Sequence, residues 1–416
     1  MVLADYVAAF RSRKIVLLLV LGFASGLPLA LTTGTLQAWL AADNVDIVAI
    51  GWFALVGQPY TYKFLWAPLM DRYSPPFLGR RRGWLLVTQV ALIGAIGFMG
   101  TLKPADSAWL LGAAALAVAF LSASQDIVFD ALRADWLARE ERGAGAAVSV
   151  LGYRVAMLVS GAGALILADQ WLGWSATYWL MAALMGVGMI ATWLVIEPET
   201  KEAAPKTLDE AVARPFAEFF SRKGAVALLL LVVLYKLGDA FAGNLTTTFL
   251  LRGPGFSLTE VGAINKGFGL AATILGALAG GAMMAKMRLY RALLLFGVLQ
   301  AVTNLGFMLL AASGKSYALM VMVIGLENLC GGMGTAAYVA LLMALCDRRF
   351  SATQYALLSA LSAVGRVYVG PAAGYLVAAA GWTQFFFCTF LIALPGLALL
   401  VWMRNRIEQL DSTTPG

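Results

Sequence analysis

The sequence lacks histidine altogether and carries little charge: only 13% of its 416 residues are charged. Without histidine, His-dependent catalytic triads, His-ligated metal sites and histidine proton relays are excluded. The three cysteines, Cys330, Cys346 and Cys388, stand singly in apolar or helix-end positions and match neither a metal motif nor a disulfide framework. We therefore expect inert buried thiols, no metal and no cofactor.

Hydrophobic residues are abundant instead, at 61% of the chain, and the mean hydropathy is +0.80. A typical soluble domain has about 25% charged and about 45–50% apolar residues. The composition thus excludes a cytosolic enzyme, a secreted domain and a DNA-binding factor, and it indicates a protein embedded in a lipid bilayer. The net charge of +7 does not indicate a nucleic-acid partner, because the basic residues are not clustered on a soluble face.

Twelve stretches are long enough to span a membrane, for which about 20 mostly apolar residues are needed. They are 14–34, 46–70, 83–101, 107–132, 146–168, 175–196, 224–250, 257–284, 292–311, 317–345, 354–379 and 382–403. No GxxxxGK[ST] phosphate-binding motif is present, so we do not expect ATP to drive the protein directly.

The longest polar stretch, 198–223, lies between the sixth and seventh spans. It divides the chain into an N-terminal six-helix bundle (1–197), a cytoplasmic linker and a C-terminal six-helix bundle with a short cytoplasmic tail (224–416). Short similarities between the halves support two weak repeats. The predicted fold is an all-α membrane protein with two pseudo-symmetric six-helix halves.

Loop charge predicts the orientation. Of the 30 Lys and Arg residues, 22 fall in segments that are cytoplasmic if the N-terminus is inside, and three fall in the opposite loops. Basic residues concentrate in cytoplasmic loops, so we expect a multi-pass protein with both termini in the cytoplasm.

The turn between the second and third spans resembles the loop signature of the major facilitator superfamily. In that signature an acid, an Arg, a Gly and basic residues follow in order; here they are Asp71, Arg72, Gly79, Arg80, Arg81 and Arg82. The turn departs from the signature in a longer insert and in Ala67, where a Gly is usual. These charges are candidates for a cytoplasmic gate, and the alternative is that they serve topology alone.

Ionisable residues inside membrane spans are expensive and indicate function. Asp126 and Asp130 lie four residues apart in the fourth span, on one helix face. Glu327 lies in the tenth span. We predict that these three acids couple transport to protons, and an Asp126–Arg154 pair is compatible with their estimated depths. The alternative is that the ions form structural pairs.

Five in-span cations face four in-span acids, and a cavity with surplus positive charge suits an anionic substrate. The candidate substrate-binding residues are Lys63, Gln125, Tyr153, Arg154, Lys236, Asp239, Asn244, Lys266, Asn328 and Arg366. Several glycines line the eighth and tenth spans, among them Gly276, Gly280 and Gly332. They indicate either close helix packing or a locally broken helix.

Long runs resemble the AmpG-type muropeptide permeases. They include LGFASGLPLALTTGTLQAW from Leu21, FLWAPLMDRY from Phe64, KLGDAFAGNLTTTFLLR from Lys236 and ENLCGGMGTAAYVALLMALC from Glu327. The resemblance covers nearly the whole chain. It implies a proton-motive-force-dependent importer in the bacterial inner membrane that carries N-acetylglucosaminyl-1,6-anhydro-N-acetylmuramic acid, with or without peptide, from periplasm to cytoplasm. It also implies a role in cell-wall recycling and in β-lactamase induction.

We therefore expect a transporter, not an enzyme, whose partners are an anhydromuropeptide, protons and lipid, and which acts as a monomer without nucleic acid. Three alternatives remain open at this point. They are a facilitator for another large anion, such as an acyl-CoA carrier or drug exporter, a membrane enzyme acting on lipid-linked sugars, and a sensor that binds its ligand without moving it.

Overall fold

The computed structural model describes residues 13–137, 142–196, 221, 224–345 and 351–412, which form helices joined by short connections. Contacts group the chain into two units. The first comprises Met1–Val45 and Val56–Ala204, and the second comprises Asp46–Leu55 and Pro205–Gly416. The expected linker, 198–223, lies outside the described residues apart from Ser221.

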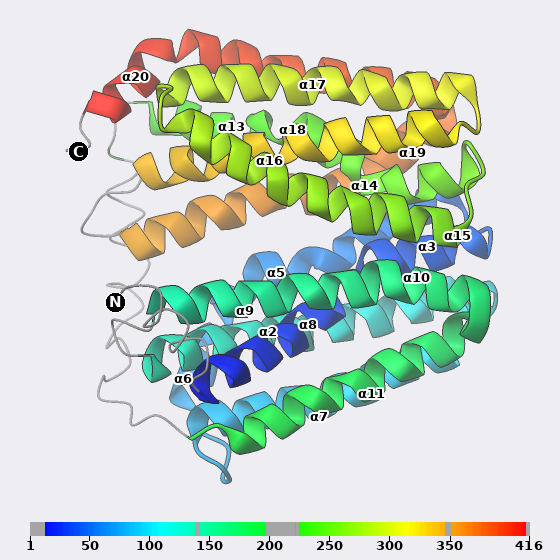
Figure 1. Cartoon of the computed structure of the whole chain (residues 1–416), viewed down its shortest axis with the longest axis vertical. Coiled ribbons are helices and arrows are strands. Elements are labelled where there is room, and N and C mark those ends of the chain that lie inside the picture. The colour runs from blue at the N-terminus through cyan, green and yellow to red at the C-terminus, as the bar shows by residue number, and fades with distance from the viewer. Residues whose placement is uncertain (1–12, 138–141, 197–220, 222–223, 346–350, 413–416) are drawn as a thin grey trace, which may run out of the picture. The chain divides into compact units, whose positions relative to one another are not determined.

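Long apolar helices build the first unit. They are α2 (Arg13–Thr32), α3 (Gly34–Ala42), α7 (Arg80–Thr101), α8 (Pro104–Trp136), α9 (Arg142–Met157), α10 (Ala164–Leu167) and α11 (Gly173–Leu194). Two π-helical segments, η3 (Leu158–Gly163) and η4 (Ala168–Leu172), flank α10. Helix α2 packs along α9, and α7 packs along α8 and α11 (Figure 1).

The second predicted span is not a continuous helix. After α4 (Ile47–Trp52) it consists of short pieces, namely the 3-10 turn η1 (Phe53–Gly57), α5 (Gln58–Tyr62), the 3-10 turn η2 (Lys63–Leu65) and α6 (Ala67–Arg72). Helix α4 packs on α19 of the second unit through glycines. A Cβ at Gly374 would come within 3.1 Å of the Val48 Cα, and one at Gly51 would meet the Gly370 carbonyl.

The second unit contains the remaining helices. They are α13 (Ala225–Tyr235), α14 (Leu237–Arg252), α15 (Leu258–Glu260), the π-helical η6 (Val261–Phe268), α16 (Gly269–Met284), α17 (Leu289–Ser313), α18 (Tyr317–Ala344), α19 (Ser351–Trp402) and α20 (Arg404–Ser412). Helix α16 packs closely on α18, where a Cβ at Gly276 or Gly332 would collide with the facing backbone. At Gly276, Gly280 and Gly332, the absence of a side chain therefore serves close helix packing rather than a break.

Each unit has its own hydrophobic core. In the first, Leu18, Val128 and Leu132 belong to one buried cluster. In the second, Leu231, Phe296 and other residues of α13, α17, α18 and α19 form another. Two of the largest side chains there, Tyr235 and Tyr338, stack with their ring centroids 5.7 Å apart. These cores hold the helices whose polar residues form the site described below.

Nine stretches of the described residues are long and apolar enough to cross a membrane. Two of them, Val148–Leu194 and Leu358–Trp402, are each divided into two helical segments at a glycine with positive φ, Gly173 and Gly381 respectively. The broken second span is too fragmented to be counted among the nine. With each pair separated and the broken span added, the segments correspond to the twelve predicted spans.

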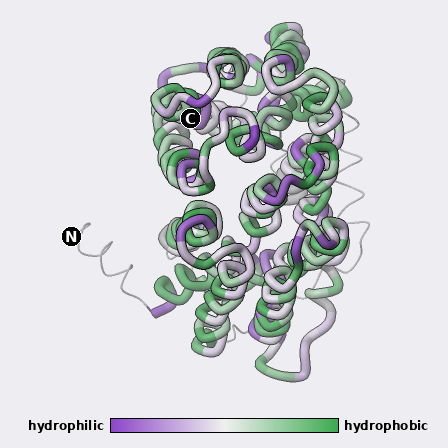
Figure 2. Tube along the Cα trace, turned by 90° about the vertical axis from the view of Figure 1, so that its right-hand side faces the viewer, coloured by the Kyte–Doolittle hydropathy of each residue, from purple (hydrophilic) through white to green (hydrophobic). Residues whose placement is uncertain are grey.

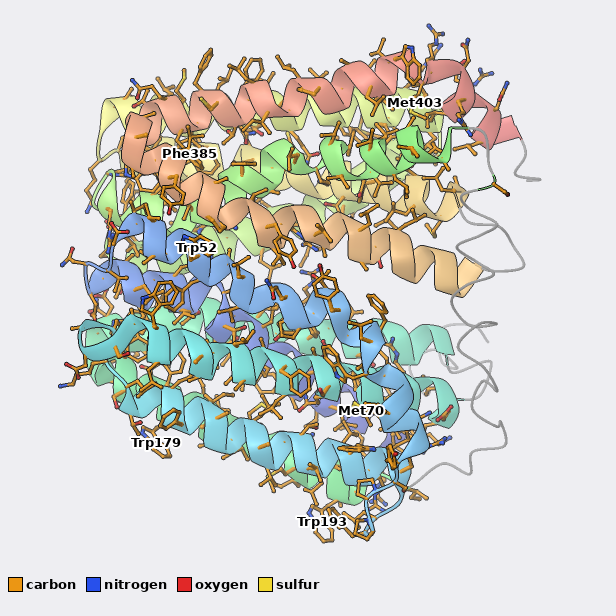
Figure 3. The ribbon with its side chains drawn as sticks, turned by 180° about the vertical axis from the view of Figure 1, so that it is seen from behind. Trp52, Met70, Trp179, Trp193, Phe385 and Met403 are labelled. Atoms are coloured by element: carbon orange, nitrogen blue, oxygen red, sulfur yellow. The ribbon has the colours of Figure 1, made fainter. Side chains whose placement is uncertain are left out.

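Many large apolar side chains on the helices are exposed, as expected for a protein that contacts lipid. Figure 2 shows hydrophobic residues along most of the helical tube. On α11, Trp179 and Trp193 are 53% and 58% exposed and project outward (Figure 3). They lie roughly 21 Å apart along the helix axis, and tryptophans are enriched at both membrane interfaces.

Candidate functional site

In the first unit, polar side chains from several helices surround Asp126 on α8. Ser25 on α2 donates a hydrogen bond to the Asp126 carboxylate. Lys63, at the start of η2, interacts electrostatically with this carboxylate, and Tyr60 and Tyr153 are further neighbours. The structure thus brings three of the predicted site residues, Asp126, Lys63 and Tyr153, into one cluster.

The neighbouring acid, Asp130, has a different environment. It is 53% exposed and forms an ion pair with Arg133, one turn away on α8, at 3.0 Å. Arg154 on α9 is also exposed, and its Nη1 lies 3.9 Å from the Met157 sulfur. No ion pair joins Asp126 to Arg154 in the described part of the first unit, so the pair that helix depth had suggested is not present in this conformation.

Gln125 on α8 is almost completely buried, with 1% of its surface exposed. Among the described residues, no donor reaches its Oε1. Buried amides are rarely left without partners in native proteins. A buried acceptor without a protein partner is suited to binding a water molecule or a substrate group.

The arginines of the predicted gate hold helix ends within the first unit. Arg81, only 7% exposed, pairs with Asp135 at the end of α8, with Nε and Oδ2 2.9 Å apart. Arg82 donates to the Thr192 and Trp193 carbonyls at the C-terminus of α11. Cations at this position complement the helix dipole.

The other gate positions are structurally less informative. Gly79 precedes α7 with a φ of 83°, which a glycine adopts without strain. Arg80 is the first residue of α7. Asp71 and Arg72 end α6, but the described part of the structure does not include their side chains. The gating role therefore stays a prediction.

In the second unit, the seventh span breaks at Lys236, between α13 and α14. The Lys236 ammonium donates to Asp239 Oδ2 at 3.2 Å and to Gln300 Oε1 at 3.3 Å. The Gln300 amide nitrogen in turn donates to Asp239 Oδ2 at 2.5 Å. The three side chains thus bond to one another in a closed triangle. The neutral amide of Gln300 on α17 bridges the ion pair between Asp239 on α14 and Lys236, which directly precedes α14.

A second group of polar residues lies beside this triangle. Lys266, on the π-helical η6, donates to Thr247 Oγ1 at 2.8 Å. Glu327 on α18 accepts from the Asn328 amide at 2.8 Å and interacts electrostatically with Asp239, Lys236 and Lys266. Since π-helical turns frequently occur at functional sites, the position of Lys266 supports its selection as a site residue.

A cavity of about 440 Å³ opens in the second unit. Its lining includes two cations and one acid, Lys236, Arg366 and Asp239, together with hydroxyl groups from α18 and α19. Asn244 donates to the Arg366 carbonyl at 3.2 Å and so fixes the backbone beside the cavity. Pockets of about 300–1,000 Å³ are typical of small-ligand sites.

Several partners of the predicted residues were missed by the sequence reasoning, among them Gln300, Ser25 and Asp135. Gln300 and Ser25 are uncharged polar residues within apolar spans that hold other polar residues as well, so neither stands out. Asp135 lies at a predicted cytoplasmic helix end, where acids are ordinary. The only signal available was that Gln300 interrupts the apolar ninth span.

The cluster chemistry suits polar, charged ligands rather than a metal. In the part of the chain that the structure describes, no group of three or more Cys, Asp and Glu residues could hold a metal ion. The described site consists of carboxylates, ammonium and guanidinium groups, amides and hydroxyls inside membrane-spanning helices. Such groups mark substrate and ion pathways in membrane proteins.

Comparison with known proteins identifies relatives along nearly the whole chain. The anhydromuropeptide permease of Escherichia coli (strain K12) is 58% identical over 405 residues, which cover 97% of this chain and 82% of the relative. A protein named putative transporter AmpG 4 from Rickettsia felis is 35% identical, covering 96% of this chain and 98% of that relative.

Solved structures share the fold at low sequence identity. A bacterial homologue of the human lysosomal transporter Spinster, inward-facing and unoccupied, has a TM-score of 0.75 at 16% identity and covers 98% of this chain and 99% of its own. The peptide transporter POT in complex with sulfate has a TM-score of 0.73 at 13% identity, covering 96% of both chains. The model of the Major Facilitator Superfamily matches residues 18–368. The chain therefore belongs to the major facilitator superfamily and, within it, to the family of the anhydromuropeptide permeases.

Proposed function

We propose that this protein imports anhydromuropeptides, namely N-acetylglucosaminyl-1,6-anhydro-N-acetylmuramic acid with or without its peptide, from periplasm to cytoplasm. The observation that carries the proposal is the 58% identity to the Escherichia coli permease over 97% of the chain. Import of these fragments would serve cell-wall recycling and supply the signal linked to β-lactamase induction.

Family membership decides against two of the three open alternatives. The protein is a multi-pass membrane transporter, not an enzyme acting on lipid-linked sugars. An acyl-CoA carrier or drug exporter is disfavoured, because the relative that matches nearly the full chain is a permease for muropeptides.

The coupling to protons is part of the proposal. Asp126, Asp130 and Glu327 are its candidate carriers, and the contacts of Asp126 with Ser25 and of Glu327 with Asn328 support the first and third. Asp130 is the weaker candidate, since it is exposed and paired with Arg133. A carboxylate that exchanges a cation partner for a proton during the transport cycle changes its proton affinity.

We further propose that both termini are cytoplasmic, that residues 1–197 and 224–416 act as two six-helix halves joined by the linker 198–223, and that the protein acts as a monomer in the bacterial inner membrane. The 22 to 3 distribution of basic residues supports the orientation. Alternating access between two such repeats is the transport mode that this architecture allows.

Uptake of a radiolabelled anhydromuropeptide into sealed membrane vesicles, with and without an imposed pH difference, tests the function. We expect accumulation that depends on the gradient and is competed by unlabelled muropeptide but not by acyl-CoA. Equal uptake without a gradient would remove proton coupling from the proposal. Binding without accumulation would instead indicate a sensor.

A further inference from the structure

The charges that line the cavity of the second unit do not cancel. Lys236 and Arg366 contribute two positive charges, while Asp239 contributes one negative charge. Lys236 is already engaged, because its ammonium bonds both Asp239 Oδ2 and Gln300 Oε1. The surplus positive charge therefore resides on Arg366.

Arg366 has no acidic partner among the residues that the structure describes, and its side chain is exposed. An arginine keeps its charge under all ordinary conditions and presents a planar fork of donors that matches a carboxylate. An uncompensated guanidinium inside a membrane span is expensive. A substrate carboxylate would supply the missing counter-charge.

Three of the hydroxyl groups around the cavity donate their protons to backbone carbonyls. Thr335 Oγ1 donates to Gly331, Ser362 Oγ to Ser359 and Tyr338 Oη to Val232, at distances of 2.7, 2.7 and 2.6 Å. Their remaining lone pairs can accept hydrogen bonds. Among its described lining residues, the cavity thus offers one cation without an acidic partner, Arg366, beside hydroxyl oxygens that can accept. This combination suits a carboxylate next to N–H groups.

From this arrangement we propose that the cavity is a carboxylate subsite of the substrate. Arg366 anchors the carboxylate, and the oxygens of Thr335 and Ser362 accept from adjacent N–H groups. The inference rests on the proposed function. It gives the two cations of the cavity different roles, because Arg366 binds substrate whereas Lys236 is held in an ion pair with Asp239. An anhydromuropeptide offers this chemistry from two sources, the end of its peptide or, without peptide, its lactyl group.

The test measures dissociation constants for the purified full-length protein by calorimetry. The probes are an anhydromuropeptide with a free peptide carboxylate, the same compound with that carboxylate amidated, and the peptide-free disaccharide with and without amidation of its lactyl carboxylate. We expect the wild-type protein to prefer the acid in at least one pair by about tenfold to a hundredfold, as for a charge-assisted hydrogen bond.

Arg366→Gln should bring this preference close to one, and Arg366→Lys should restore part of it, because lysine keeps the charge but lacks the fork. Thr335→Ala should weaken the acid and the amide equally, since both carry N–H groups. Arg291→Gln, an exposed arginine at the start of α17, is the matched control and should keep the wild-type preference.

If Arg366→Gln loses the preference for acid over amide with the peptide-bearing compounds, Arg366 binds the peptide carboxylate. If it loses this preference with the peptide-free disaccharides, Arg366 binds the lactyl carboxylate. A wild-type protein that binds acids and amides equally, or an Arg366→Gln variant that keeps the preference, overturns the subsite while leaving the proposed function intact. If no compound binds at all, the proposed function itself fails.

Discussion

Gln300 holds the Lys236–Asp239 pair from a different helix, with 4% of its own surface exposed. Its carbonyl accepts from the ammonium and its NH₂ group donates to the carboxylate, a combination that a carboxylate or hydrocarbon cannot supply. Gly334 on α18 leaves room for it, since a Cβ at Gly334 would collide with the amide.

Replacing Gln300 with Leu should therefore leave two partly buried ionic groups, Lys236 and Asp239, short of a partner. We expect a loss of about 1–3 kcal/mol in the free energy of unfolding and strongly reduced uptake. Asn304→Leu is the matched control on the same helix, because no acceptor within the described residues reaches its Nδ2. Thermal unfolding in detergent and vesicle uptake measure both effects; equal behaviour of the two variants would show that the triangle is dispensable.

Replacing Asp126 should impair the coupling of transport to protons rather than the folding of the protein. Asp126→Asn keeps the size of the side chain and its acceptor for Ser25 but removes the exchangeable proton. Uptake driven by a pH difference should be abolished while the protein still folds and binds substrate. Asp106→Asn, near the other end of α8, should transport normally. Normal pH-dependent accumulation by the Asp126 variant would exclude this residue as the proton carrier.

Sequence reasoning identifies such residues when their charge makes them conspicuous in an apolar span, as for Lys236, Asp239 and Glu327. It estimates depth from the helix rise but not the direction in which a side chain points. That is why Asp126 and Arg154 could be placed at compatible depths although Asp126 bonds Ser25 instead. Partners that are neutral, such as Gln300, carry no comparable signal.

The helices α16 and α18 depend on small residues for their close approach to each other. A Cβ at Gly276 would collide with the Leu329 carbonyl, whereas nothing lies within 4 Å of one at Gly281 on the same helix. In membranes, such small-residue contacts replace the hydrophobic driving force between helices.

Gly276→Ala should thus destabilise the protein by about 1–3 kcal/mol through overpacking. Gly281→Ala should be neutral or stabilising, by up to about 1 kcal/mol, because alanine favours the helix. The midpoints of thermal unfolding in one detergent compare the two variants. A more stable Gly276→Ala protein would contradict the packing role.

Hydropathy predicted the spans to within a few residues because crossing a bilayer requires a fixed apolar length. It did not predict the breaks at Lys236 or along Phe53–Leu65, nor the π-helical turn at Val261–Phe268. These features alter backbone hydrogen bonding without altering mean apolarity, so a window of residues averages over them.

The proposed orientation of the whole molecule in the membrane can be tested at the two ends of one helix. Helix α17 has 25 residues and is about 37 Å long, enough to cross the bilayer. Ser313 is its last residue and the exposed Arg288 precedes its first. The two residues should therefore lie on opposite sides of the membrane.

In a variant without the native cysteines, Ser313→Cys should react with a membrane-impermeant thiol reagent from the periplasmic side. Arg288→Cys should react only after the inner membrane is permeabilised. The reverse pattern would place both termini outside and would overturn the charge argument.

Because Asp46–Leu55 group with the second unit, the chain crosses between the two units three times. The polypeptide passes from one unit to the other at Val45–Asp46, at Leu55–Val56 and again at Ala204–Pro205. The Leu55–Val56 peptide falls inside the 3-10 turn Phe53–Gly57, a kind of segment that often acts as a hinge. A rocking motion of the units would therefore bend the chain at Val45–Asp46 and at Leu55–Val56, and the second bend would fall in this 3-10 turn.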